Sequence, residues 1–250
     1  MKSLHIFILS YFVLSVSTTF SQVDFNNYRT LLANGKIPSD FTTTPEKKFE
    51  TLLNKNKEIY STTDKKKFLL TSTKAVDELL HSGLVIYGDD ISKYVEDVAH
   101  KVLSKDPELK KELRFYVLKS NVTNALSTNQ GIIFVTTGLI AELTNEAQLA
   151  YILAHEIAHY KENHALKSYE WSSNQRGQSI IEMSTFSKEN EFAADKMAVE
   201  MYKNAGYDPD EILGVFDVLM YSYLPFDEIP MDKQYIGGDK SYFPEGVWGK

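Results

Sequence analysis

The most telling absence in this 250-residue sequence is cysteine, which does not occur at all. Without thiols the chain cannot form disulfides, thiolate zinc sites or iron–sulfur clusters, and it has no cysteine nucleophile. Glycine and proline are also sparse, at 12 and 7 residues, which excludes a collagen-like or low-complexity protein. A formal net charge of -7 argues against nucleic acid as a partner, because phosphate is bound by basic surfaces. Any metal must therefore be held by carboxylates and by the six histidines.

The sequence also lacks a hydrophobic run long enough to cross a membrane. Its most apolar stretch, residues 4–16, is 13 residues long, whereas a transmembrane helix needs about 20. Because a basic start precedes this stretch and small residues follow it, we expect residues 1–21 to be a signal peptide, with cleavage after Ser21. A retained membrane anchor is the alternative. The mature chain is expected to be exported without a stable membrane span, to the periplasm first of all or to the extracellular space.

Three regions are predicted after the signal. Residues 22–82 are polar and lysine-rich, with apolar residues at helical spacing, and predict an N-terminal extension of two helices. Residues 83–223 are the expected core, and residues 224–250, rich in proline, glycine and tyrosine, are the expected tail or lid. Composition leaves open whether the extension is a removable pro-region and whether the tail gates the site.

Within the core, strand and helix patterns are mixed, which predicts an α+β fold with a small sheet and more helix than strand. Asn145 is the expected N-cap of the central helix, with Gln148 in the reciprocal capping position. β-branched and aromatic runs predict strands at residues 83–87, 113–118 and 131–136. Apolar spacing predicts helices at residues 91–103, 139–143, 145–164, 187–203 and 210–223.

The strongest motif is His155-Glu156-Ile157-Ala158-His159, on the predicted helix 145–164. Residues four apart share one face of a helix, so both imidazoles can point at one ion. Glu156 is rotated to the side where a metal-bound water would sit. This is the H-E-x-x-H pattern of a zinc hydrolase, whereas two unrelated surface histidines are the alternative.

A catalytic zinc site needs a third protein ligand, and cysteine is not available to supply it. His164 lies about 140° around an ideal helix from His159, which makes it a poor candidate. We expect Glu191 to be the third ligand, with Asp195 four residues later accepting a hydrogen bond from a ligand histidine. Glu189 is the nearest competitor, and a solvated helix face is the alternative for this pair.

These motifs resemble the HtpX and CAAX-prenyl-protease family of zinc metallopeptidases, of the gluzincin type. The resemblance covers about residues 83–206, and the chain is more similar to the soluble periplasmic branch of that family than to its membrane-bound members. It implies that His155, His159 and Glu191 bind one zinc ion per chain and that Glu156 is the catalytic base. It also implies a minimal zincin fold with the sheet over the H-E-x-x-H helix. A His-Pro element with a later arginine is absent here, so the group that stabilises the oxyanion stays open, with Arg176 and several tyrosines as candidates.

We therefore expect an exported zinc endopeptidase that acts on proteins or peptides, with a zinc-bound water activated by Glu156 and a role in envelope protein quality control. The strand that contains Gly131, Ile132, Ile133 and Phe134 is predicted to be an edge that pairs with extended substrate, or else an ordinary core strand. The alternative function is a non-catalytic zinc-binding or chaperone-like protein that holds clients in its cleft. The oligomeric state and the natural substrate stay open.

Overall fold

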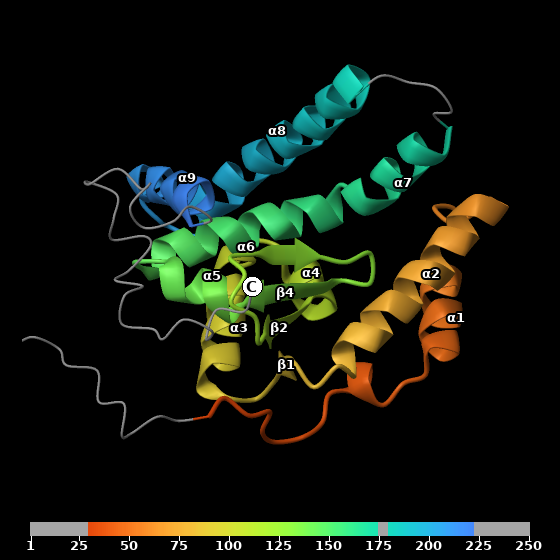
Figure 1. Ribbon diagram of the computed structural model, residues 1–250, viewed down its shortest axis with the longest axis horizontal. Coiled ribbons are helices and arrows are strands. Elements are labelled where there is room, and N and C mark those ends of the chain that lie inside the picture. Colours follow the sequence, from red (N-terminus) through yellow and green to blue (C-terminus); the bar gives the residue numbers. More distant parts are fainter. Residues whose placement is uncertain (1–29, 175–179, 223–250) are drawn as a thin grey trace, which may run out of the picture. The chain divides into compact units, whose positions relative to one another are not determined.

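The computed structural model describes residues 30–174 and 180–222, with backbone only at residue 174 and residues 180–185 (Figure 1). The expected signal peptide, the expected tail and Arg176 lie outside these residues. The described residues from Leu31 onward belong to one unit. Among the described helices, none is both long enough and apolar enough to cross a membrane.

A four-stranded mixed sheet forms the centre of this unit, in the order β1-β2-β4-β3. β2 runs parallel to β4, whereas β1 and β3 are antiparallel to their neighbours. The strands are β1 (Val85–Ile86), β2 (Arg114–Leu118), β3 (Ala125–Ser127) and β4 (Ile132–Thr136). The predicted strands at residues 83–87, 113–118 and 131–136 are thus present, and β3 was not predicted.

Alternate residues of the strands face two different helical layers, as the two-residue period of a strand requires. Phe115 and Ile133 belong to the core shared with α3 (Asp90–Val102) and α6 (Glu146–Lys161). Tyr116 and Phe134 face the opposite way, toward α2 (Thr63–Leu80). The sheet is therefore covered on both faces, which explains why β4 is apolar from Ile132 to Val135. The α+β fold class and the mainly helical composition are confirmed.

The central helix α6 begins at the predicted cap. The Asn145 side chain accepts a hydrogen bond from the Gln148 N–H, and the Gln148 side chain accepts one from the Thr144 N–H at 3.0 Å. The helix ends at Lys161, three residues before the predicted end, because Asn163 adopts a left-handed backbone with φ 55°. The next helix, α7 (His164–Asn174), starts in a new direction.

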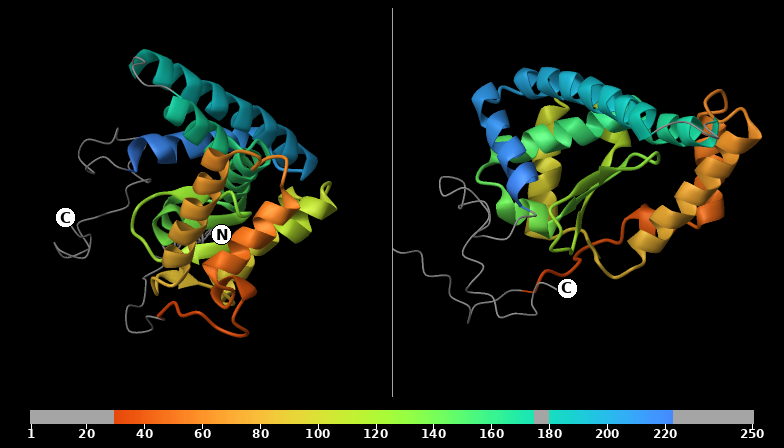
Figure 2. Two further views of the ribbon diagram at one scale, coloured as in Figure 1. Left: turned by 90° about the vertical axis from the view of Figure 1, so that its right-hand side faces the viewer. Right: turned by 45° about the horizontal axis from the view of Figure 1, so that its top comes forward.

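α8 (Ile180–Asn204) runs along α6, as Figures 1 and 2 show, and begins earlier than the predicted residue 187. Ala194 and Ala198 are fully buried, and their small side chains let the two helices approach closely. Gly206, at φ 82°, follows the end of this helix. The close contact places acidic residues of α8 opposite the histidines of α6.

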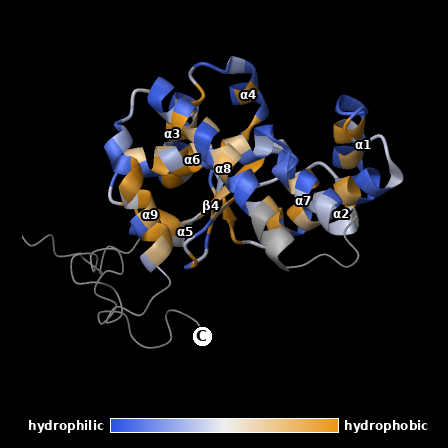
Figure 3. Cartoon of the chain, turned by 90° about the horizontal axis from the view of Figure 1, so that it is seen from above, coloured by the Kyte–Doolittle hydropathy of each residue, from blue (hydrophilic) through white to orange (hydrophobic). Residues whose placement is uncertain are grey.

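After η3 (Pro209–Glu211), the last described helix, α9 (Ile212–Tyr221), packs across the start of α6. Gly214 permits the approach, because a Cβ at this position would lie 2.3 Å from Nε2 of Gln148. α9 is apolar over most of its surface (Figure 3). Its large exposed hydrophobic residues are Leu213, Phe216, Leu219 and Met220.

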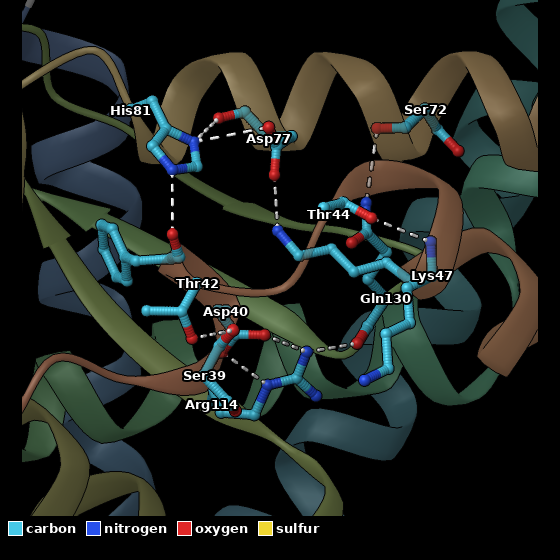
Figure 4. A network of polar contacts seen from close by, with 12 residues as sticks. Ser39, Asp40, Thr42, Thr44, Lys47, Ser72, Asp77, His81, Arg114 and Gln130 are labelled. Atoms are coloured by element: carbon cyan, nitrogen blue, oxygen red, sulfur yellow. Dashed lines mark hydrogen bonds and ion pairs between the residues drawn. The ribbon is translucent and has the colours of Figure 1, made fainter.

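The described part of the N-terminal extension contains η2 (Ser39–Phe41), α1 (Pro45–Lys55) and α2, so both predicted helices are present. Asp40 lies at the centre of the polar contacts drawn in Figure 4, accepting bonds from the Arg114 guanidinium at 3.0 and 3.2 Å. The Tyr116 hydroxyl donates to the same carboxylate at 2.8 Å. These contacts join η2 to strand β2 of the sheet. Two short helices remain: α4 (Pro107–Glu112) precedes β2, and α5 (Thr137–Glu142) follows β4.

Candidate active site

The predicted ligand atoms of α6 and α8 converge on one point. Nε2 of His155 lies 2.9 Å from Nε2 of His159. Oε2 of Glu191 lies 3.2 Å from the first of these nitrogens and 3.5 Å from the second. Among the described residues, these three form the group whose histidine and carboxylate atoms could hold a metal ion. Glu189 is not part of this group.

This donor set fits zinc. Two imidazole nitrogens and one carboxylate oxygen, with a fourth position left open, are a common ligand set of catalytic zinc. Tetrahedral bonds of about 2.0–2.1 Å separate ligand atoms by roughly 3.3 Å, which is close to the three distances here. A cation between them also removes the repulsion that three electron-rich atoms would otherwise experience at this spacing.

His155 is held in the orientation that metal binding requires. Its Nδ1 lies 2.9 Å from Oδ1 of Asp195, which can only accept, so Nδ1 carries the proton and Nε2 presents its lone pair. The Tyr151 hydroxyl donates to the same carboxylate oxygen at 2.9 Å. Burial, reinforced by this bond to Asp195, raises the pKa of the Tyr151 phenol, which keeps it protonated as a donor. Asp195 therefore lies where the sequence predicted an acceptor.

His159 has a different partner, which the sequence reasoning did not assign. Nδ1 of the buried His164 lies 2.9 Å from Nδ1 of His159. Burial, followed by the proximity of His159, lowers the pKa of His164 to about 4, so its ring is neutral and can accept from the His159 Nδ1–H. The turn at Asn163 produces this contact. His164 is thus a positioning partner of His159 and not a metal ligand.

Glu156 faces β3, on the other side of the histidine rings. The hydroxyl and the backbone N–H of Ser127 both donate to its carboxylate. Burial raises the pKa of Glu156 above its ordinary value, and this shift is opposed by His159 and by the two bonds from Ser127. A carboxylate whose pKa lies above its usual range is suited to accept and return a proton.

The prediction that the strand with Gly131, Ile132, Ile133 and Phe134 is an exposed edge is wrong. β4 is paired with β2 on one side and with β3 on the other, so its backbone has no free row of hydrogen-bonding groups for substrate. All five residues of β4 are buried. The edge beside the candidate metal site is β3.

The free groups of β3 can be identified from its pairing. Asn124 and Thr128 bond to β4 through the Asn124 carbonyl and the Thr128 N–H. Because bonding direction alternates along an antiparallel strand, Ala125 and Ser127 direct their backbone groups away from β4. The Ser127 N–H is used by Glu156, whereas the N–H and C=O of Ala125 face the cleft.

A helix with two histidines that could hold a metal ion and a glutamate between them in the sequence, beside an antiparallel edge strand, is the arrangement of a minimal zincin domain. In agreement, residues 89–183 match Peptidase family M48. The match includes the H-E-x-x-H motif and ends before Glu191 and Asp195, whose assignment rests on the geometry described above.

The chain is also similar to beta-barrel assembly-enhancing proteases. It is 23% identical to the protein of Escherichia coli strain K12 over 163 residues, covering 54% of this chain and 34% of the relative. The protein of Yersinia pestis is 23% identical over 166 residues, with the same two shares. The chain therefore spans about a third of the length of the curated relatives it matches. The expected resemblance to the branch of the family that contains these proteases is confirmed.

Proposed function

We propose that this chain is an exported zinc endopeptidase with protein or peptide substrates. The observation that carries the proposal is the convergence of His155, His159 and Glu191, with Glu156 beside them in a cleft next to the edge strand. The match to Peptidase family M48 supports peptide hydrolysis as the reaction. Zinc is the proposed ion, at one per chain.

Different residues of the site carry different parts of the proposed reaction. His155, His159 and Glu191 would hold the zinc ion, which would supply Lewis acidity toward the scissile carbonyl and would lower the pKa of a water molecule to about 7. Glu156 takes one proton from the attacking water and delivers it to the leaving amine, so that the hydroxyl remains on the carbonyl carbon as the C–N bond breaks. Asp195 and His164 hold the two imidazoles in the required tautomers.

Substrate binding is assigned to β3. The outward N–H and C=O of Ala125 can pair with the backbone of an extended peptide, which accepts many sequences because side chains do not make these bonds. This assignment replaces the one first made for residues 131–134. The place of action is proposed to be the periplasm, and the names of the relatives suggest envelope proteins as the substrate class.

The decisive experiment compares the wild type with Glu156→Gln on an unfolded protein substrate. The variant removes the base while its side chain keeps nearly the same size, so zinc content should be unchanged and cleavage should fall by at least about 100-fold. Glu200→Gln, which changes an exposed carboxylate of α8, is the matched control and should cleave normally. Equal cleavage by the wild type and Glu156→Gln would contradict the proposal. If the wild type binds zinc and unfolded protein without cleaving it, the chaperone-like alternative replaces the peptidase.

A further inference from the structure

The helix α7 determines where His164 lies, because His164 is its first residue. Nδ1 of this buried ring lies 2.9 Å from Nδ1 of His159, whose Nε2 is one of the three converging ligand atoms. The left-handed backbone at Asn163 separates α7 from α6, so α7 does not simply continue the motif helix. Contacts that hold α7 in place therefore also hold the hydrogen-bond partner of a metal-site histidine.

One face of α7 packs against α2, a helix of the N-terminal extension (Figure 1). Leu166, Tyr169 and Glu170 share this face, because residues three and four apart lie on the same side of a helix. The centroid of the Tyr169 ring lies 5.0 Å from that of the Phe68 ring. The Glu170 carboxylate forms an ion pair with Nζ of Lys65 at 3.0 Å.

Leu166 is buried by residues of the extension. Its side chain is 4% exposed and belongs to one hydrophobic cluster with Tyr60 and Leu69. The partly buried residues packed against this cluster also come from the extension, namely Phe49, Leu52, Leu53, Ile59 and Phe68. Loss of the extension would return Leu166 to water, which is unfavourable for an apolar side chain.

The extension supports α7 close to His164 and leaves the cleft open. Leu166 follows His164 by two residues, whereas Trp171, which stacks on Phe186 of α8 at 5.4 Å, lies about two turns further along. The two cavities beside the metal site are lined by residues from Asn124 onward. Residues 30–82, the described part of the extension, therefore do not cover the site as an inhibitory pro-region would.

We propose that the N-terminal extension is a permanent support of the metal site and not a removable pro-region, with Phe68 and Leu166 as positioning residues that hold His164 against His159. This inference rests on the zinc site of the proposed function. Hydrogen-bond partners fix the tautomer and orientation of a ligand imidazole. Loosening the contact between α2 and α7 should therefore weaken zinc binding although all three ligands remain.

The first test measures the zinc affinity of Phe68→Ala by competition with a chelator. This variant removes the ring that packs on Tyr169, and affinity should fall by roughly 3–10-fold, less than the about 10–100-fold expected when a direct partner of a ligand is lost. Tyr169→Ala removes the same contact from α7 and should have the same effect. Val76→Ala is the matched control on α2, because Val76 is 9% exposed and packs against the sheet. It should weaken folding and leave the zinc affinity of the folded protein unchanged.

A double-mutant cycle shows whether Phe68 acts through His164. His164→Ala alone should lower zinc affinity by about 10–100-fold, and adding Phe68→Ala should lower it no further. Wild-type affinity in Phe68→Ala and Tyr169→Ala, an equal loss in Val76→Ala, or additive losses in the double variant would overturn the positioning role. Absence of Glu156-dependent cleavage would overturn the peptidase function alone, because this inference is measured by zinc affinity.

Cutting the chain between the extension and the core tests whether the support is permanent. A protease recognition sequence inserted after Ser82 lies in an exposed turn, where a Cβ at Gly83 would meet no atom within 4 Å. After the cut, the two fragments should remain together in gel filtration, with unchanged zinc affinity. Release of the extension without a loss of zinc affinity, or peptide cleavage that begins only after its release, would contradict the proposal. Release accompanied by a loss of zinc affinity would support the positioning role.

Discussion

The candidate metal site and the polar contacts around Asp40 are two clusters of charged side chains. They differ in whether the donors and acceptors of the cluster are matched with one another. Around Asp40, the groups pair with one another: Arg114 and Tyr116 donate to its carboxylate, and nearby Lys48 donates to Asp77 at 2.6 Å. At the site, His155, His159 and Glu191 present acceptors to one another. The first cluster has its donors and acceptors matched, whereas the second could hold a metal cation.

We therefore expect the contacts around Asp40 to contribute to folding stability and the candidate metal site to contribute to function. A network whose donors and acceptors are matched should contribute to folding in the absence of metal. The site should contribute little until zinc binds, and from then on zinc binding adds to stability because the ion binds the folded chain. Four substitutions can therefore test the comparison.

The largest effect is expected for Glu191→Gln. Loss of a direct ligand should lower zinc affinity by more than about 100-fold and reduce peptide cleavage in proportion. Glu189→Gln is the matched control on the same helix, and it should bind zinc normally because Glu189 is not in the converging group. Competition with a zinc chelator measures both affinities. A reversed result, with Glu189 as the sensitive residue, would show that the third ligand is misassigned.

The next effect is expected for Asp195→Asn, which leaves the three ligands in place. The amide can no longer fix the Nδ1–H tautomer of His155 as a charged acceptor does, so zinc affinity or activity should fall by about 10–100-fold. The same competition assay applies, with Glu200→Gln as the control on the exposed face of α8. An affinity equal to that of the wild type would mean that Asp195 does not position His155.

Asp40→Asn tests the other cluster. This change weakens the bonds from Arg114 and Tyr116, and we expect the free energy of unfolding to fall by about 1–2 kcal/mol. Urea denaturation of the zinc-free protein measures this loss, with the exposed Glu50→Gln on α1 as control. Zinc affinity should not change. A large loss of zinc affinity instead would show that the two clusters are coupled through the sheet.

The smallest effect concerns pH. Nδ1 of His81 lies 2.8 Å from the Asp77 carbonyl and Nε2 lies 3.0 Å from the Phe41 carbonyl, so only the protonated ring can donate to both. These two carbonyls raise the pKa of His81, an effect aided by the Asp77 carboxylate and opposed by Lys48. The stabilisation is therefore complete below about pH 6.5 and is lost as the pH rises through the raised value.

His81→Ala should accordingly destabilise the protein more at about pH 5.5 than at about pH 8.5, as measured by the shift in urea midpoint at the two values. The effect should be slight because the ring is half exposed. A destabilisation that is equal at both values would mean that His81 packs against η2 without a contribution from its charge.

The sequence predicted the parts of the fold that depend on local patterns. The motif helix, its cap at Asn145 and the acidic pair on α8 follow from helical spacing, and the structure places Asp195 where this spacing suggested. β3 was missed because it is only three residues long, and all three are partly buried, which leaves no alternation to detect.

Two further features depend on tertiary context. The apolar run of β4 is compatible with an edge or with a core strand, and the pairing of β4 on both sides selects the core strand. His164 was judged by the geometry of an unbroken helix, whereas the left-handed backbone at Asn163 redirects the chain and brings its ring to His159. Neither the order of strands nor this turn can be obtained from residue spacing alone.

The central claim is that one zinc ion is bound by two histidines of α6 and one carboxylate of α8. Anomalous diffraction from crystals of the zinc-loaded protein, recorded at the zinc absorption edge, tests it most directly. We predict a single strong peak per chain, about 2.0–2.2 Å from Nε2 of His155, Nε2 of His159 and a carboxylate oxygen of Glu191. A zinc-loaded crystal with no peak there, or with a peak that Glu191 does not reach, would contradict the account.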